Sequence, residues 1–293
     1  MNTRLAATIW DKHRLEWDQQ TYVMGIVNLT PDSFSGDGLA EETLTQGQIV
    51  ERAVALARKF VAEGATMIDV GGESTRPQFA PISVDQELAR VLPVINALHA
   101  NLPGEIMISI DTYKAEVARQ ALDAGACIIN DIWALRQDPN MAALVSERGV
   151  PVILMANMRG YQRREIVSDV VRFLAYSIDL ALAAGVAWER IIIDPGIGFG
   201  TTPEENLTLL HRLGDLRVLG RPILLGTSRK STIGQVLGGL PASERLEGTA
   251  ATVALGIAQG ADIVRVHDVH EMVRVVKMSD AIVRGKYSLR KPD

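Results

Sequence analysis

Residues 23–34, VMGIVNLTPDSF, form a short apolar run that changes at Asn28 into a polar cluster. A buried strand of a parallel sheet has this form, because both of its faces are covered and only its end meets solvent. In an open dinucleotide-binding sheet the first strand would lead into a GxGxxG turn, but here it leads into NLTPDSF. The stretch therefore favours a closed parallel barrel, with a doubly wound open sheet as the alternative fold.

Seven more apolar runs of this kind follow along the chain. They are MIDVGGESTRP at 67–77, IMISIDT at 106–112, CIIND at 127–131, VILMAN at 152–157, IIIDPGIGFG at 191–200, ILLGTSRK at 223–230 and IVRVHD at 263–268. Between and after the runs lie segments with helical periodicity, at 46–63, 84–100, 113–124, 139–148, 164–184, 203–213, 245–258 and about 270–283. Eight such β/α units predict a single-domain (β/α)8 TIM barrel over residues 21–293. Residues 1–20 are expected to form an N-terminal extension, a strand or hairpin that caps the bottom of the barrel.

Composition narrows the class of protein. The chain has 293 residues and a formal net charge of -5, which argues against a general nucleic-acid binder. Its single cysteine, Cys127, lies in an apolar run, so neither a disulfide framework nor a CxxC metal site is expected. No apolar run has the length of a membrane span, and residues 1–20 mix both charge signs, unlike a secretory signal. We therefore expect a cytoplasmic protein without a membrane partner.

The last two runs end in basic residues. GTSRKST follows the seventh run and contains Arg229 and Lys230 just before a helical segment, and the eighth run adds Arg265 and His267. Barrels commonly bind phosphate with the loops after strands seven and eight, helped by a helix N-terminus. The pattern predicts a cationic wall suited to pyrophosphate. The alternative is that Arg229 and Lys230 are solvated loop charges and Asp268 only caps the last helix.

Carboxylate and amide side chains end three other runs. Asp111, Asn130 and Asp194 each stand at the carboxyl end of a predicted strand and should point into the mouth of the pocket. A carboxylate can accept two parallel N–H bonds, and an asparagine offers a donor and an acceptor together. These residues therefore suit a planar heterocycle with amino and lactam edges. Alternatively they hold loops by capping helices, which is a real possibility for Asp194 before Pro195 and Gly196.

The first two runs lead into long polar loops that could close over the pocket as lids. Asn28 could offer its amide oxygen to Mg²⁺ held mainly by substrate phosphates and water, and Thr75 and Arg76 could bind a second substrate. The alternative is that the proline and glycine residues of these loops form ordinary structural turns. A zinc site is not expected, since His267 and His270 have no cysteine or further histidine nearby in the sequence to complete a ligand set, and no GxSxG nucleophile motif is present.

Seven of these motifs, in order, resemble those of the dihydropteroate synthases of folate biosynthesis. They are MGIVNLTPDSFS, IDVGGESTRP, SIDTYKAEVA, IINDI, DPGIGFG, GTSRKS and RVHDV, and the match as a whole spans about residues 22 to 284. The resemblance implies a (β/α)8 barrel that joins 6-hydroxymethyl-7,8-dihydropterin pyrophosphate to 4-aminobenzoate and releases pyrophosphate with the help of Mg²⁺. It also implies that pyrophosphate departs ahead of attack by the arylamine.

The resemblance assigns roles residue by residue. It implies pterin binding by Asp111, Asn130, Asp194 and Lys230. It implies pyrophosphate binding by Asn28, Arg265 and His267, with Asn28 linked to the metal. It places Thr75, Arg76, Pro77, Phe199, Lys230 and Ser231 around the aminobenzoate or the closing loops. We further expect a homodimer, for which the apolar last helices could supply the interface.

Some positions depart from the family pattern. Where the family commonly has Met-His-Met after the fifth strand, this chain has Met155, Ala156, Asn157 and Met158, and Thr201 replaces the usual lysine after GFG. These changes motivate an alternative reading as a catalytically weak pterin-binding paralogue, and they bear on sensitivity to sulfonamides that mimic aminobenzoate. A methyltetrahydrofolate-dependent methyltransferase is a further alternative, but it would need no pyrophosphate wall.

Overall fold

The strands form a parallel barrel. The computed structural model describes residues 5–30, 44–74, 80–285 and 287. Its eight-stranded sheet has the order β8-β7-β6-β5-β4-β3-β10-β9, and a parallel bridge between Ile193 and Ile223 joins β8 to β9. The strands are β3 (Tyr22–Asn28), β4 (Met67–Gly71), β5 (Met107–Asp111), β6 (Ile128–Asp131), β7 (Val152–Met155), β8 (Ile191–Asp194), β9 (Leu224–Leu225) and β10 (Ile263–Val266). The predicted (β/α)8 barrel is confirmed.

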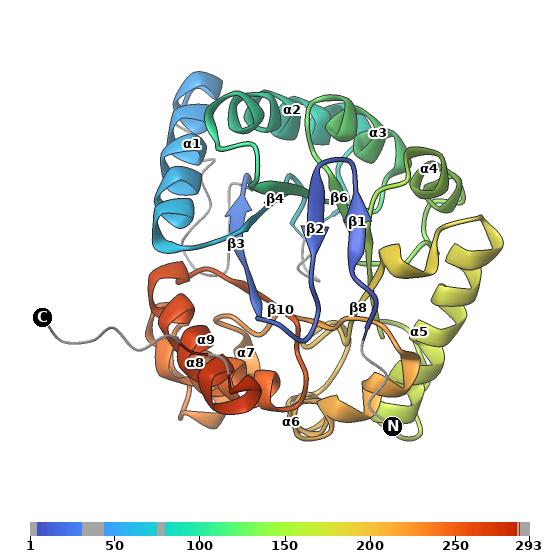
Figure 1. Ribbon diagram of the computed structural model, residues 1–293, viewed down its shortest axis with the longest axis vertical. Helices are drawn as coiled ribbons and strands as arrows, with labels where there is room; N and C mark the ends of the chain where they lie inside the picture. The colour runs from blue at the N-terminus through green and yellow to red at the C-terminus, as the bar shows by residue number, and fades with distance from the viewer. Residues whose placement is uncertain (1–4, 31–43, 75–79, 286, 288–293) are drawn as a thin grey trace, which may run out of the picture.

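Helices surround this barrel, as Figure 1 shows. They are α1 (Gln46–Glu63), α2 (Val84–Asn101), α3 (Ala115–Asp123), α4 (Met141–Arg148), α5 (Ile166–Ala183), α6 (Pro203–His211), α7 (Ser231–Val236), α8 (Leu246–Ala258) and α9 (Val269–Arg284). Helices α1, α2 and α6 begin with capping boxes at Thr45, Ser83 and Thr202. In each box the side chains satisfy N–H groups that the first turn leaves without a helical partner. These local signals fix where the helices start.

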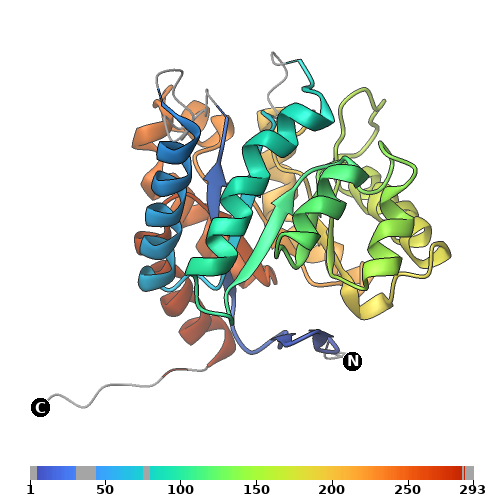
Figure 2. The same ribbon diagram turned by 90° about the horizontal axis from the view of Figure 1, so that it is seen from above.

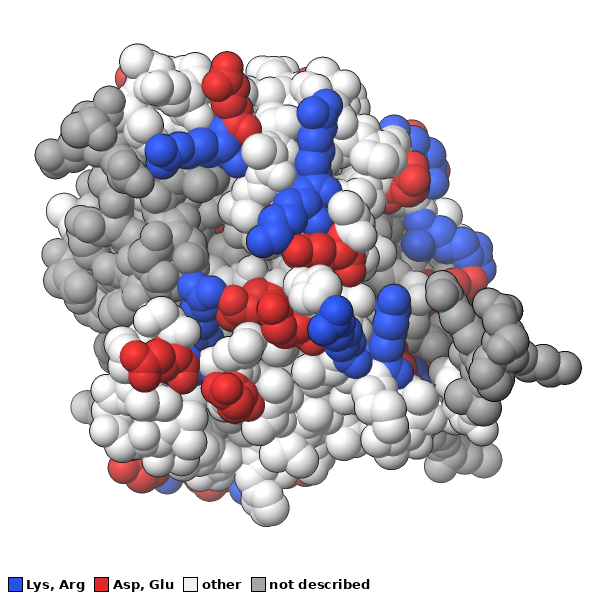
Figure 3. All heavy atoms as spheres, turned by 90° about the vertical axis from the view of Figure 1, so that its left-hand side faces the viewer, with Lys and Arg blue, Asp and Glu red and all other residues white. Residues whose placement is uncertain are grey.

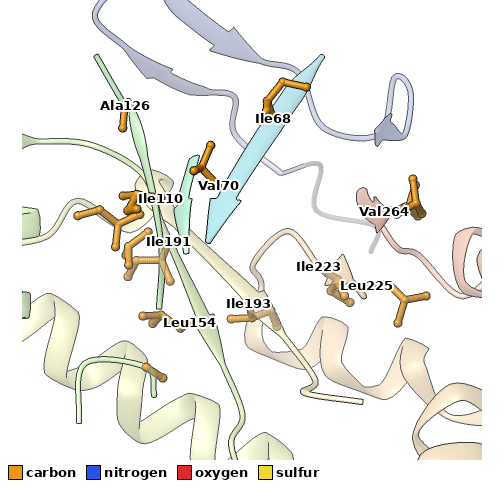
Figure 4. Close-up of a cluster of buried hydrophobic side chains, with 14 of the residues drawn as sticks. Ile68, Val70, Ile110, Ala126, Leu154, Ile191, Ile193, Ile223, Leu225 and Val264 are labelled. Atoms are coloured by element: carbon orange, nitrogen blue, oxygen red, sulfur yellow. The ribbon is translucent and has the colours of Figure 1, made fainter. Parts of the chain in front are cut away.

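The alternation of side chains along each strand decides which residues point outward to the helices and which point into the barrel. Ile68, Val70, Ile110, Leu154 and Val264 point outward, toward the helices, in a cluster that Figure 4 shows. Every strand contributes to a separate, lower cluster of inward apolar side chains: Tyr22 and Met24 of β3, and Met67, Met107, Ile128, Ile153, Ile192, Leu224 and Ile263 of the other strands. Side chains two residues apart lie on the same face of a strand. The next inward layer, toward the carboxyl ends, therefore contains the polar residues Asp69, Ser109, Asn130, Asp194 and Arg265.

A hairpin formed by β1 (Thr8–Trp10) and β2 (His13–Leu15) lies at the amino end of the barrel (Figure 2). Its Trp10 and Leu15, with Trp17 after it, belong to the same cluster as the lower inward layer. The indole Nε1 of Trp17 donates to Thr8 Oγ1 at 3.0 Å. The hairpin thus packs against the floor of the barrel, at the end opposite the polar layer. The division of the chain at residue 20 remains a prediction.

The sequence predicts a helical segment near GTSRKST without giving its bounds. The structure shows the short helix α7 at this place, and it begins at Ser231 within the motif.

Within the described ranges, no helix combines the length and apolar character needed to cross a bilayer.

Candidate active site

A buried network of two carboxylates, an amide and a guanidinium lies in the polar layer. Arg265 donates from Nε to Asp69 Oδ2 at 2.6 Å and from Nη2 to Asp111 Oδ2 at 2.9 Å. Asn130 donates from Nδ2 to the same Asp69 oxygen at 3.1 Å. These residues come from β4, β5, β6 and β10. They are far apart in sequence, but their side chains meet toward the carboxyl end of the barrel. The structure thus brings three predicted site residues together.

The opposite wall of the site is built by the loops after β8 and β9. A Cβ placed on Gly226 would lie 4.0 Å from both Asp194 Oδ2 and the Arg265 Cβ, so these two side chains flank one point. Lys230 donates from Nζ to the Ile197 carbonyl at 2.7 Å, and the same nitrogen lies 4.2 Å from the centre of the Phe199 ring. Asp194, Lys230 and Phe199 therefore belong to the same pocket as Arg265.

Burial changes the charge states of these groups. It raises the pKa of Asp111 to about 7, with Arg265 acting against the rise and Asp69 adding to it. It raises the pKa of Asp194 to about 6, although the Gly196 N–H, Lys230 and Arg265 favour the ionised form. Burial likewise lowers the pKa of Lys230 to about 8, against the attraction of Asp194. Each group therefore titrates near neutral pH, as functional groups in enzyme pockets commonly do.

His267 lies beside Ser228 and carries no charge at neutral pH. Burial lowers its pKa to about 3, and the cations Arg265, Arg229 and Lys230 lower it further. Its Nδ1 lies 2.9 Å from Ser228 Oγ, and that oxygen also accepts the His267 backbone N–H at 3.1 Å. Of the residues expected to form a cationic wall, Arg265 and Lys230 are positively charged at neutral pH, whereas His267 is a neutral imidazole, and pyrophosphate binding stays a prediction.

Arg229 and Asp268 tie the last two loops to each other. The Arg229 guanidinium forms an ion pair with Asp268, and both side chains are largely buried. Arg229 has a left-handed backbone, with φ of 56°, and its N–H donates to Thr249 Oγ1 at 3.1 Å. Asp268 makes no side-chain cap to α9. The alternative of a solvated Arg229 beside a capping Asp268 is thus wrong, because each side chain is the ionic partner of the other.

The remaining predicted residues are distributed around the same mouth. The Oδ1 of Asn28 and the Oδ2 of Asp111 lie 3.8 Å and 3.7 Å from the position that a Cβ on Gly71 would occupy. Ser231 is exposed at the first residue of α7, directly after Lys230. Thr75, Arg76 and Pro77 lie outside the described residues.

Two of the departures from the family pattern have structural roles here. Thr201 Oγ1 donates to Asn206 Oδ1 at 2.6 Å and accepts the Gly198 N–H at 3.1 Å, which stabilises the loop after β8. Asn157 is fully buried; its Oδ1 accepts the Arg159 N–H at 3.3 Å, and its Nδ2 has no hydrogen-bond partner among the described residues. Thr201 therefore supports the loop that carries Phe199.

Sequence reasoning missed two parts of the site. Asp69 stands inside the apolar run MIDV, and its inward direction becomes evident only from the strand register. Lys114 forms ion pairs with Glu73 and Glu87, and Tyr113 donates to Glu73 at 2.9 Å. This second cluster anchors the chain just after β4. An acidic residue within an otherwise apolar strand was the available signal for Asp69.

Comparison with known proteins identifies the family. Residues 24–267 match the family described as pterin binding enzyme. A dihydropteroate synthase of Bacillus subtilis is 46% identical over 269 residues, which cover 92% of this chain and 91% of the relative. The chain belongs to the dihydropteroate synthase family.

Solved structures of dihydropteroate synthases agree in fold and coverage. The Clostridium difficile enzyme, crystallised in the presence of pteroic acid, has a TM-score of 0.85 and 47% identity, covering 92% of this chain and 99% of that one. The Xanthomonas albilineans enzyme with 4-aminobenzoic acid has a TM-score of 0.84 and 42% identity, covering 92% and 95%. The family's barrel is therefore present almost in full, and the chain is an enzyme of this family.

Proposed function

We propose that the chain condenses 6-hydroxymethyl-7,8-dihydropterin pyrophosphate with 4-aminobenzoate to give 7,8-dihydropteroate and pyrophosphate. The observation that carries this proposal is the buried network in which Arg265 bridges Asp69 and Asp111 beside Asn130. Such a network presents fixed donors and acceptors to a flat polar ring. Family membership and the relatives' ligands, pteroic acid and 4-aminobenzoic acid, support the same substrates.

In the proposed binding mode the pterin ring lies between the two walls of the pocket. Asp111, Asn130 and Asp194 bind its N–H and carbonyl edges, and Lys230 binds it from the side of Phe199. Asp111 and Asp194 must be ionised to accept N–H bonds from the ring. With pKa values of about 7 and about 6, both carboxyls lose this ability as the pH falls through that range.

The reaction itself requires little proton chemistry. The C–O bond between the pterin methylene and the pyrophosphate breaks, the arylamine nitrogen forms a C–N bond to that carbon, and one N–H proton is released. Negative charge grows on the departing pyrophosphate oxygens, so the positive charge of Arg265 and the hydrogen-bond donors near His267 stabilise the transition state. Asp111 and Asp194 stabilise the cationic pterin. An arylamine is already a nucleophile, so a strong general base is not required.

Mg²⁺ is proposed as a metal that arrives with the pyrophosphate. Among the described residues, no three His, Cys, Asp or Glu side chains are grouped so as to hold a metal ion. Mg²⁺ keeps several waters and is commonly bound by one or two protein oxygens together with substrate phosphates. Asn28 Oδ1, beside Asp111 at the carboxyl end of β3, fits such a single protein ligand. When bound, the ion would neutralise negative charge on the leaving group.

The aminobenzoate is proposed to bind over Phe199 and Lys230, near Ser231. Lys230 faces the Phe199 ring, and Arg159 lies 5.1 Å from the centre of the same ring. A second substrate with an aromatic ring and a carboxylate suits this combination of π-face and cations. The contributions of Thr75, Arg76 and Pro77, and sensitivity to sulfonamides, remain predictions.

One assay tests the proposed reaction. Purified protein, Mg²⁺, the pterin pyrophosphate and radiolabelled 4-aminobenzoate should yield labelled dihydropteroate and an equal amount of pyrophosphate. Binding of pteroate without product formation would instead support the weak paralogue suggested by Ala156, Asn157 and Thr201. A methyltransferase would transfer a methyl group from methyltetrahydrofolate, which the same preparation should fail to do.

We also propose that two copies associate through the C-terminal helices. Leu255, Met278 and Ile282 are 67%, 62% and 71% exposed on α8 and α9, which pack against each other. The lower part of the face in Figure 3, where these helices lie, shows few charged side chains. Ile282→Glu should dissociate the dimer in sedimentation experiments, whereas Val218→Glu, at an equally exposed position elsewhere, should not. Monomeric wild-type protein would contradict the proposal.

The proposed cytoplasmic location fits the state of the single cysteine. Cys127 is a free thiol, and burial raises its pKa to about 11. Such a thiol stays protonated and unreactive at neutral pH.

A further inference from the structure

Asp69 is fully buried beneath the proposed pterin site. It lies on β4 in the inward layer above Met67, and 0% of its surface is exposed. Its Oδ2 accepts hydrogen bonds from Arg265 Nε and Asn130 Nδ2. Its Oδ1 is buried and has no hydrogen-bond partner among the described residues. A buried carboxylate with one unsatisfied oxygen is unfavourable for folding, so its presence calls for a function.

An ionised carboxylate only accepts hydrogen bonds, and this fixes the direction of its neighbours. Asn130 must turn its NH₂ group toward Asp69, so its Oδ1 points away and remains an acceptor. Arg265 uses Nε on Asp69 and Nη2 on Asp111, which orients the planar guanidinium at two points. Its Nη1 makes no hydrogen bond within the described part of the chain. One buried anion thus orients two groups that face the ligand.

We propose that Asp69 is a positioning residue that sets which edge of Asn130 and which edge of Arg265 the pterin pyrophosphate meets. The inference rests on the proposed roles of Asp111 and Asn130 in pterin binding and of Arg265 in pyrophosphate binding. It predicts selectivity for a substrate that presents an N–H donor to Asn130 Oδ1 and an acceptor or anion to Arg265 Nη1. Asp69 itself touches neither substrate.

Asp69→Asn tests the proposal because it keeps the shape and removes the anion. An amide can also donate, so Asn130 would no longer be held in one orientation. Pteroate binding at pH 7.5 should weaken by roughly tenfold to a hundredfold, because hydrogen bonds to charged groups are the strong class. The KM for aminobenzoate should stay within about twofold of wild type, since that substrate lies on the other wall.

The pH dependence separates positioning from a general structural effect. Ionised Asp111 is needed for binding, and the negative charge of Asp69 contributes to the raised pKa of Asp111. In wild type, pteroate binding should therefore weaken as the pH falls through about 7. In Asp69→Asn this midpoint should move to lower pH, because a repelling charge is gone. Loss of structure alone would weaken binding without moving the midpoint in this direction.

Asp262→Asn is the matched control. Asp111→Asn tests whether the proposed pterin site is correct. Asp262 is also a buried carboxylate, but it accepts the Ile223 N–H at the amino end of β9, so its replacement should leave pteroate binding and its pH midpoint unchanged. If Asp111→Asn has no effect, the proposed pterin site is wrong. If Asp111→Asn weakens binding while Asp69→Asn binds within about twofold with an unmoved midpoint, only the role of Asp69 is overturned.

A measurement on wild-type protein covers the case in which Asp69→Asn does not fold. The Arg265 Nε–H should give a slowly exchanging NMR signal in the absence of ligand, because Asp69 holds it in a buried hydrogen bond. The exposed Arg274 is the internal comparison. Exchange at Arg265 as fast as at Arg274 would overturn the inference.

Discussion

Replacement of Lys230 by Met removes one charge from the pocket and keeps most of the side-chain volume. The ammonium group makes a charged hydrogen bond to the Ile197 carbonyl, lies over the Phe199 ring and attracts Asp194. A charged hydrogen bond contributes about 1.5–3 kcal/mol, and a cation over an aromatic ring about 0.5–2 kcal/mol. If half of this sum is realised at the transition state, kcat/KM should fall by roughly fivefold to seventyfold.

The same replacement should change the pH profile. Lys230 holds the pKa of Asp194 down, and burial already raises that pKa to about 6. Removal of an opposite charge raises a carboxyl pKa by about one to three units, so Asp194 would be at most about half ionised at pH 7. The acid limb of kcat/KM should therefore move to higher pH. The alkaline limb near pH 8, where wild-type Lys230 loses its proton, should disappear.

Initial rates of dihydropteroate formation between pH 5 and 9.5, with the pterin substrate well below its KM, measure both effects. Lys230→Arg is the matched control, because it keeps the charge and should keep the acid limb where it is. Turnover within about twofold of wild type, or a lower rate with an unmoved acid limb, would show that the Lys230 charge does not act in this way.

Three other perturbations have expected outcomes. Gly196→Ala places a Cβ 1.9 Å from the Ala156 carbonyl oxygen at φ of 72°, whereas Gly238→Ala has the same left-handed backbone but no atom within 4 Å. Urea unfolding should show a loss of about 1 kcal/mol for Gly238→Ala and several times more for Gly196→Ala, and equal losses would contradict the packing argument. Burial raises the pKa of Asp262 from 3.8 to about 6, so the free energy of unfolding of wild type falls as the pH rises between these values. Asp262→Asn should therefore raise the free energy of unfolding, measured in urea, by up to about 3 kcal/mol at pH 8 and change it little at pH 4. Chelation of Mg²⁺ should stop turnover but leave pteroate binding intact, and Asn28→Ala should raise the Mg²⁺ concentration needed for half-maximal rate; loss of pteroate binding on chelation would contradict a metal that arrives with the pyrophosphate.

Local signals were sufficient for most of the fold. The predicted helix at 46–63 matches α1, because Thr45 and Gln48 form a capping box and Gly64 ends the helix in a left-handed conformation. The eight apolar runs became the eight barrel strands. Short α7 lacked a defined prediction, because a helix of Ser231–Val236 is stabilised by its packing more than by its own periodicity.

The sequence predicted that several polar side chains would meet at one end of the barrel, but it missed Asp69 and the electrostatics of the cluster. Asp111, Asn130 and Asp194 end strands, and the carboxyl ends of barrel strands always meet. The neutral state of His267 depends on burial and on three cations, of which Arg229 and Lys230 come from the loop after β9. No pattern along the chain reports the dielectric surroundings of a side chain, so a histidine beside arginines could not be distinguished from a charged one.

By itself, the sequence determined the barrel, the order of its motifs and the end at which the polar side chains gather, because strand periodicity and helix caps act over a few neighbouring residues. Only the tertiary structure decided that Asp69 faces inward and that Arg229 binds Asp268. The first depends on strand register, since a shift of one residue would turn Asp69 to the other face of the sheet, and the second depends on the packing of two loops that are distant in sequence.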